Sequence, residues 1–182
     1  MKSIYSFSIR AILLISLLFN AYNKVQAQAQ QNTRAQKKQQ KLDAVKKMVN
    51  NQNYIFMAER ANPLGWGTIN LNYNYNVVVS KDSVDSYLPY FGRAYVAPIN
   101  PVDPKETGIQ FKSKNFDYNS VLSKRSGWEV IIVPHDVKET RKFILDISEA
   151  GYATLSVTSE NRQSISFDGY ITENVPKKKK AS

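Results

Sequence analysis

Short runs of β-branched and aromatic residues, separated by turn-forming residues, follow one another along most of this chain. In residues 152–158 and 163–167 apolar and polar residues alternate, which is the pattern of a strand with one buried face. Many short strands at close spacing favour an antiparallel sheet over parallel strands joined by helices. We therefore expect an all-β fold that is mainly antiparallel. It is either a barrel, which could be lipocalin-like, or a sandwich, and the alternation does not separate the two.

Gly, Pro, Asn and Asp divide the apolar runs and set the expected bounds of the strands. Residues 62–65 and 81–83 are expected to be turns, and residues 139–141 could form a helical turn before Phe143. We expect strands over residues 54–58, 68–71, 75–80, 86–96, 109–112, 116–122, 128–133, 143–147, 152–158, 163–167 and 170–171.

An amphipathic pattern precedes the first expected strand. Leu42, Val45 and Val49 recur at helical spacing, with lysines on the other face. This predicts one N-terminal amphipathic helix, from Ala35 to about Asn50, that packs on the edge of the domain.

The first residues have the order of a secretory signal: a basic start, an apolar run over residues 11–19, and small residues around Ala27. The run is too short for a permanent transmembrane helix, which needs about 20 apolar residues. We expect residues 1–27 to be a signal peptide, cleaved after Ala27 or, alternatively, after Ala29. No later segment is long and apolar enough to span a membrane. We therefore expect an exported protein, periplasmic or secreted.

Composition divides the rest of the chain into three parts. Residues 28–41 read as a Gln- and Lys-rich spacer, 42–173 as a single β-rich domain, and 174–182 as a basic tail. The absence of cysteine excludes disulfides and a cysteine-linked lipid anchor. The domain must therefore depend on its apolar core or on oligomerisation.

The net charge of +10 is concentrated at the two ends of the chain. Residues 51–176 hold 12 basic and 14 acidic side chains, so this body carries a small negative charge. Both basic ends lack the interleaved aromatic residues of a stacking platform, and we do not expect nucleic acid as a partner. The ends could contact an anionic polymer, or they could be solvated tails.

Four segments of the chain stand out by their order: Leu88–Tyr95, Ile147–Ala153, Asn161–Gln163 and Ile165–Ile171. In this order they resemble the domain-of-unknown-function family DUF4251, and the resemblance covers about residues 45–173. Ala150 departs from the family pattern, which often has Asn there. The resemblance implies an exported all-β domain, typical of Bacteroidetes, without an assigned activity.

The chain has few side chains that could take part in catalysis or bind a metal. His135 is the only histidine, and the chain has no cysteine, no G-x-S-x-G motif and no phosphate-binding glycine loop. Asp82 and Asp85 lie in an expected turn, which explains them without catalysis. We expect no catalytic residues, no metal site and no cofactor, and hence a protein that is not an enzyme.

The best candidate for a binding site is a group of aromatic residues around an arginine. Tyr87, Tyr90 and Tyr95 surround Arg93 in the sequence, and Arg162, in a turn between two late strands, could join them. Aromatic faces and a guanidinium could hold an anionic or sugar-like ligand. The alternative is structural, with tyrosines that fill the core and an arginine that pairs with a carboxylate.

The sequence thus favours an exported, soluble, non-enzymatic domain that binds a small ligand or an envelope protein. The alternatives are a hydrolase of envelope or dietary glycans and a purely structural envelope protein. A deep pocket with two facing carboxylates would favour the hydrolase. An aromatic-lined barrel mouth would favour a small ligand, and a filled core with an exposed apolar patch would favour a protein partner.

Overall fold

A computed structural model describes residues 33–97, 107–124 and 126–175. The expected signal peptide, the start of the spacer and most of the basic tail lie outside these described residues. The described residues form a helix over residues 33–50 and ten strands of one sheet. The strands are β1 (Tyr54–Pro63), β2 (Ile69–Asn70), β3 (Asn76–Ser80), β4 (Ser83–Leu88), β5 (Ile109–Ser113), β6 (Phe116–Leu122), β7 (Trp128–Pro134), β8 (Thr140–Ile147), β9 (Tyr152–Ser159) and β10 (Ile165–Glu173).

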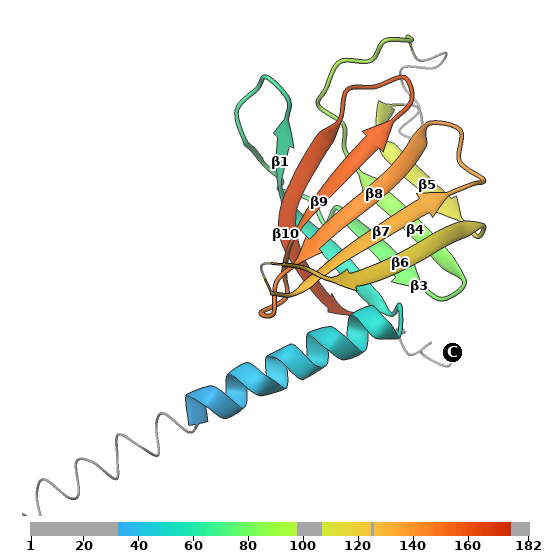
Figure 1. Cartoon of the computed structure of the whole chain (residues 1–182). Coiled ribbons are helices and arrows are strands. Elements are labelled where there is room, and N and C mark those ends of the chain that lie inside the picture. The colour runs from blue at the N-terminus through green and yellow to red at the C-terminus, as the bar shows by residue number, and fades with distance from the viewer. Residues whose placement is uncertain (1–32, 98–106, 125, 176–182) are drawn as a thin grey trace, which may run out of the picture. The chain divides into compact units, whose positions relative to one another are not determined.

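The sheet is an up-and-down arrangement that curls into a nearly closed barrel (Figure 1). Its strand order is β5-β4-β3-β1-β10-β9-β8-β7-β6, with β2 paired to β1, and the paired strands are antiparallel. The two ends of this order, β5 and β6, are consecutive in the chain. The prediction of an antiparallel all-β fold is confirmed, and the structure decides for the barrel over the sandwich.

Alternate residues of the strands point into the barrel and form one apolar core. In β7 every second residue is buried, and β3 and β9 follow the same alternation. The largest side chains without exposed surface are Tyr54, Phe56, Phe143 and Phe167. Phe111 of β5 contacts Phe143 of β8 with ring centroids 5.5 Å apart, so large side chains also meet across the interior. The interior of the barrel is therefore a packed core.

The junction of β1 and β10 requires an unusually close approach of two backbones. A β-bulge interrupts their register between Ala58 and Arg60, and Gly169 lies opposite Ala58. A Cβ on Gly169 would lie 1.8 Å from the carbonyl oxygen of Met57. Glycine is needed here because any other side chain would collide with the neighbouring strand.

The helix confirms the predicted amphipathic segment. Its residues 41–50 belong to the same compact unit as the sheet. Val45 and Val49 are buried there, and the Tyr118 hydroxyl on β6 donates a hydrogen bond to the carbonyl of Val49 at 3.0 Å. The helix begins at residue 33, so it includes part of the segment that composition assigns to the spacer. No helix among the described residues is long and apolar enough to cross a membrane.

Asp136, in the turn after β7, holds the corner between β5 and β6. Its carboxylate accepts hydrogen bonds from the Ser113 hydroxyl and from the backbone N–H groups of Lys114 (2.9 Å) and Asn115 (3.3 Å). The Ser113 hydroxyl, and next the Lys114 N–H, lower the pKa of Asp136 because they favour its charged form. The β5–β6 corner is thereby tied to the neighbouring turn.

Several expected bounds differ from the structure. The strand expected over 86–96 begins instead at Ser83 and ends at Leu88, because Pro89 has no N–H to donate to a continued ladder. Asp85 therefore lies in β4, not in a turn. The turn expected at residues 62–65 begins later, since β1 continues to Pro63, and β8 starts at Thr140 without a helical turn. The last two expected strands form one continuous β10.

We predict that Gly169→Ala lowers the free energy of unfolding by about 1–3 kcal/mol, because the new Cβ must displace the β1 backbone. Gly67→Ala is the matched control, since a Cβ there meets nothing within 4 Å. Urea denaturation measures both variants. Equal stability of the two variants would contradict the close approach at the junction.

Two buried tyrosines, Tyr54 and Tyr118, should make the domain less stable at high pH. Burial raises the pKa of Tyr118 to about 12 and raises that of Tyr54 well above its ordinary value. In the unfolded chain these groups ionise near pH 10, so their contribution is complete below about pH 10 and is lost as the pH rises towards 12. Tyr118→Phe should flatten this decline, whereas Tyr152→Phe, at a 69% exposed position, should not. Thermal melts between pH 8 and 12 measure the effect.

Candidate functional site

Arg162 lies at the centre of the cluster that the sequence indicated. It is only 7% exposed. Its guanidinium pairs with the Glu139 carboxylate at 2.8 Å, donates to the Gly108 carbonyl at 2.7 Å, and lies 5.2 Å from the ring centroid of Tyr90. The planar guanidinium is thus held by a carboxylate, a carbonyl and an aromatic face. These contacts belong to the fold and orient Arg162 among the residues that surround it.

Tyr90 fastens the segment after β4 to the turn between β9 and β10. Its hydroxyl lies 2.8 Å from the carbonyl oxygen of Arg93 and 2.9 Å from that of Gln163, and can donate to either. The Gln163 N–H donates to the Arg93 carbonyl at 2.9 Å, and the Tyr95 N–H donates to the Asn161 carbonyl at 2.8 Å. Burial raises the pKa of Tyr90, although the Arg162 charge opposes this.

The structure places four of the five predicted residues on the segment after β4 and the adjoining β9–β10 turn. Tyr90 and Arg162 are in contact, and Arg93 joins them through its backbone carbonyl, while its side chain is exposed. Tyr95 joins through its backbone N–H, and its side chain is 70% exposed. Tyr87 lies on the outer face of β4, in a separate aromatic group.

That aromatic group comprises Tyr73, Tyr75 and Tyr87. The rings of Tyr75 and Tyr87 are stacked with centroids 5.5 Å apart, and those of Tyr73 and Tyr75 are tilted at 6.1 Å. Sequence reasoning missed Tyr73 and Tyr75. The signal that could have found them is the alternation of Asn with apolar and aromatic residues over residues 70–76.

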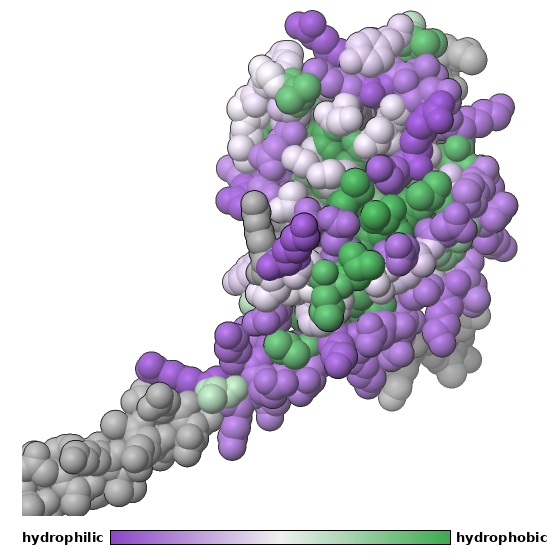
Figure 2. All heavy atoms as spheres, viewed as in Figure 1, coloured by the Kyte–Doolittle hydropathy of each residue, from purple (hydrophilic) through white to green (hydrophobic). Residues whose placement is uncertain are grey.

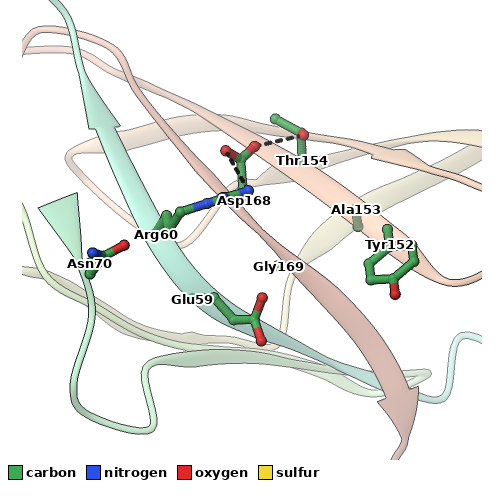
Figure 3. A pocket seen from close by; sticks show the side chains of 8 residues that line it. All are labelled: Glu59, Arg60, Asn70, Tyr152, Ala153, Thr154, Asp168 and Gly169. Carbon is green, nitrogen blue, oxygen red and sulfur yellow. Dashed lines mark hydrogen bonds and ion pairs between the residues drawn. The ribbon is translucent and has the colours of Figure 1, made fainter. Parts of the chain in front are cut away.

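A polar hollow of about 500 Å³ lies on the outside of β1, β9 and β10 (Figure 3). Asp168 is its central charge, and it accepts hydrogen bonds from Asn62 and Thr154, both at 2.9 Å, and pairs with Arg60 at 3.7 Å. Figure 3 shows Arg60 and Thr154 reaching Asp168 from different strands. Because both oxygens of the carboxylate have protein partners, this network serves to fasten three strands beside the bulge.

A second hollow, of about 750 Å³, lies along β6, β7 and β8. Val121 and Leu122 line it with exposed side chains. Glu129 and Asp146, which lie directly opposite each other on β7 and β8, also line it. Apolar residues gather on the face of the molecule that these strands form (Figure 2).

His135 follows β7, as expected, and its Nε2 lies 3.0 Å from a carboxylate oxygen of Asp117 at the surface. Among the described residues, no group of three or more His, Cys, Asp or Glu side chains has the arrangement of a metal site.

The described residues thus form a small antiparallel barrel domain with a packed interior, and the polar, apolar and aromatic groups described above lie on its outer surface. The family model of DUF4251, described as a domain of unknown function, matches residues 36–171. The chain therefore belongs to the DUF4251 family, which confirms the resemblance seen in the sequence.

A crystal structure of a DUF4251 family protein from Bacteroides eggerthii DSM 20697 is similar in fold. The TM-score is 0.53 at 13% sequence identity, and the match covers 73% of this chain and 87% of that chain. No curated protein matches the chain.

We predict that Arg162→Ala lowers the free energy of unfolding by about 1.5–3 kcal/mol, because it removes charge-assisted hydrogen bonds from a buried site. Arg93→Ala should change it by less than about 0.5 kcal/mol, because that side chain is exposed. Chemical denaturation compares the two variants. The opposite order would show that Arg93, rather than Arg162, holds this part of the fold.

Proposed function

We propose that this chain is an exported, non-enzymatic binding protein of the cell envelope, and that the outer face of β6–β8 holds another protein. The observation that carries the proposal is the apolar character of this outer face. Export is supported by the signal pattern in residues 1–27.

The packed interior supports binding on the outside of the barrel. A barrel that carries a small ligand keeps space among its inward side chains. Here the inward positions carry large residues without exposed surface, such as Phe56, Phe143 and Phe167.

Four apolar residues on the outer face of β6–β8, Val121, Ile131, Val133 and Ile144, are called the apolar face below. Polar and charged residues, including Asn119 and Lys142, surround them on the same side of the sheet. Ile131 and Ile144 lie directly opposite each other on β7 and β8, and each alternates with buried residues of its own strand. A sheet face that meets only water usually carries polar residues. Adjacent apolar residues on such a face are typical of a protein contact surface.

The apolar face continues to an edge of the sheet, because β6 is the last strand of the order. A partner could therefore pair an extended segment with β6 and lay apolar side chains against the face. Three acidic residues, Asp117, Glu129 and Asp146, outnumber Lys142 on this outer face, which favours a partner whose apolar centre is flanked by Lys or Arg.

A hydrolase is the second candidate, and one observation favours it. Glu129 and Asp146 face each other across β7 and β8 beside the 750 Å³ hollow, and paired carboxylates are the usual catalytic groups of glycosidases. Glu129→Gln separates the two functions: it should abolish any glycan hydrolysis and leave protein binding within about threefold, since a rim charge contributes little affinity.

The test places a photo-crosslinking residue at position 144 of the full chain in its own cells, with position 78 on the outer side of β3 as the control. We expect position 144 alone to crosslink to a protein. The affinity of that protein, once purified, should fall at least about tenfold with Ile144→Ser and stay unchanged with Val78→Ser. Equal crosslinking at the two positions, crosslinking only to a second copy, or no crosslink would overturn the proposal.

A further inference from the structure

Tyr73, Tyr75 and Tyr87, with Asn76 and Gln110, form a second surface, called the tyrosine surface below. It lies on β3, β4, β5 and the segment before β3, in different strands from the apolar face. Tyr73 is 74% exposed and Tyr87 is 46% exposed, whereas Tyr75 is half-buried and packs against the core. Two rings are thus open to solvent and a third supports them.

The supporting ring is fixed by the backbone. The Ala58 N–H of β1 donates to the Tyr75 carbonyl at 2.9 Å, and the Tyr75 N–H donates to the Tyr73 carbonyl at 2.8 Å. Because Tyr75 contacts both other rings, it limits the positions that Tyr73 and Tyr87 can take. The aromatic faces are therefore arranged before any ligand arrives, which lowers the entropy lost on binding.

Amide side chains stand on both sides of Tyr87. Asn76 of β3 and Gln110 of β5 are its direct cross-strand neighbours, so all three side chains share one face of the sheet. The Asn76 amide N–H donates to the Asn74 carbonyl at 2.8 Å, which orients its oxygen as an acceptor. In the next row along the same strands, Lys112 lies 3.7 Å from Asp85, so these two opposite charges offset each other.

We propose that the tyrosine surface binds a neutral oligosaccharide. Sugar rings present C–H groups on their faces, which pack against the negative faces of aromatic rings. Their hydroxyl groups both donate and accept hydrogen bonds, as amide side chains do. Open tyrosines bordered by amides, with the neighbouring Lys112 paired to Asp85, fit this ligand better than an anion, which would need a cation to pair with.

The experiment measures binding of the full chain to a panel of neutral linear hexasaccharides by calorimetry: β-1,4-linked glucose, β-1,4-linked xylose, α-1,4-linked glucose and β-1,4-linked N-acetylglucosamine. We expect at least one to bind, and Tyr87→Ala and Tyr73→Ala each to weaken it at least tenfold. Tyr87→Phe should retain binding, because it keeps the ring. Tyr152→Ala is the matched control, since Tyr152 is exposed on β9, and it should bind like the unchanged chain.

Three results would overturn the proposal: no member of the panel binds at millimolar concentration, Tyr152→Ala weakens binding as much as Tyr87→Ala does, or only a sulfated polysaccharide binds and salt abolishes it. Melting temperatures show whether each variant is folded. Crosslinking at position 144 in the Tyr87→Ala variant separates this proposal from the previous one, because loss of sugar binding should leave that crosslink unchanged.

Discussion

The pairing of β1 with β10 is the contact on which the rest of the barrel depends. Without it the strands would form two separate meanders, β1–β3–β4–β5 and β6–β10, and β1 and β10 would become open edges. Gly169 allows the two backbones to meet at the bulge, and Asp168 beside it fastens β1, β9 and β10 together from outside. Once this junction forms, the inward side chains of both meanders share one core.

The pattern of apolar and polar residues in the sequence predicts most of the strands, but it does not predict that the sheet closes into a barrel. The expected bounds of β6, β7 and β9 lie within one residue of the observed ones. Apolar and polar residues alternate in β9, and a β-branched run after Gly127 marks β7. The choice between barrel and sandwich depends on which distant strands pair, and a one-dimensional pattern carries no such information. The bounds of β4 were wrong because its aromatic residues continue past Pro89, beyond the last ladder pair at Leu88.

The sequence also could not show which residues of the candidate site lie together in space. Tyr87 and Tyr90 are three residues apart, yet the first lies on the outer face of β4 and the second packs under Arg162. Nearness in the sequence therefore did not imply one site. Tyr73 and Tyr87 both contact the ring of Tyr75, because β3 pairs with β4. Since the interior is packed, both of our proposals place binding on the outer surface, one on an apolar face and one on a face rich in tyrosine and amide groups.

Native-state hydrogen exchange tests most directly whether the β1–β10 junction holds the barrel together. We expect the amides shared by β1 and β10, around Met57 and Gly169, to exchange only with the free energy of global unfolding, as do those of β8 and β9. The central role of this junction would be contradicted if the β1–β10 amides opened at a clearly lower free energy while those of β7, β8 and β9 stayed protected. That result would show that the core does not require the closure.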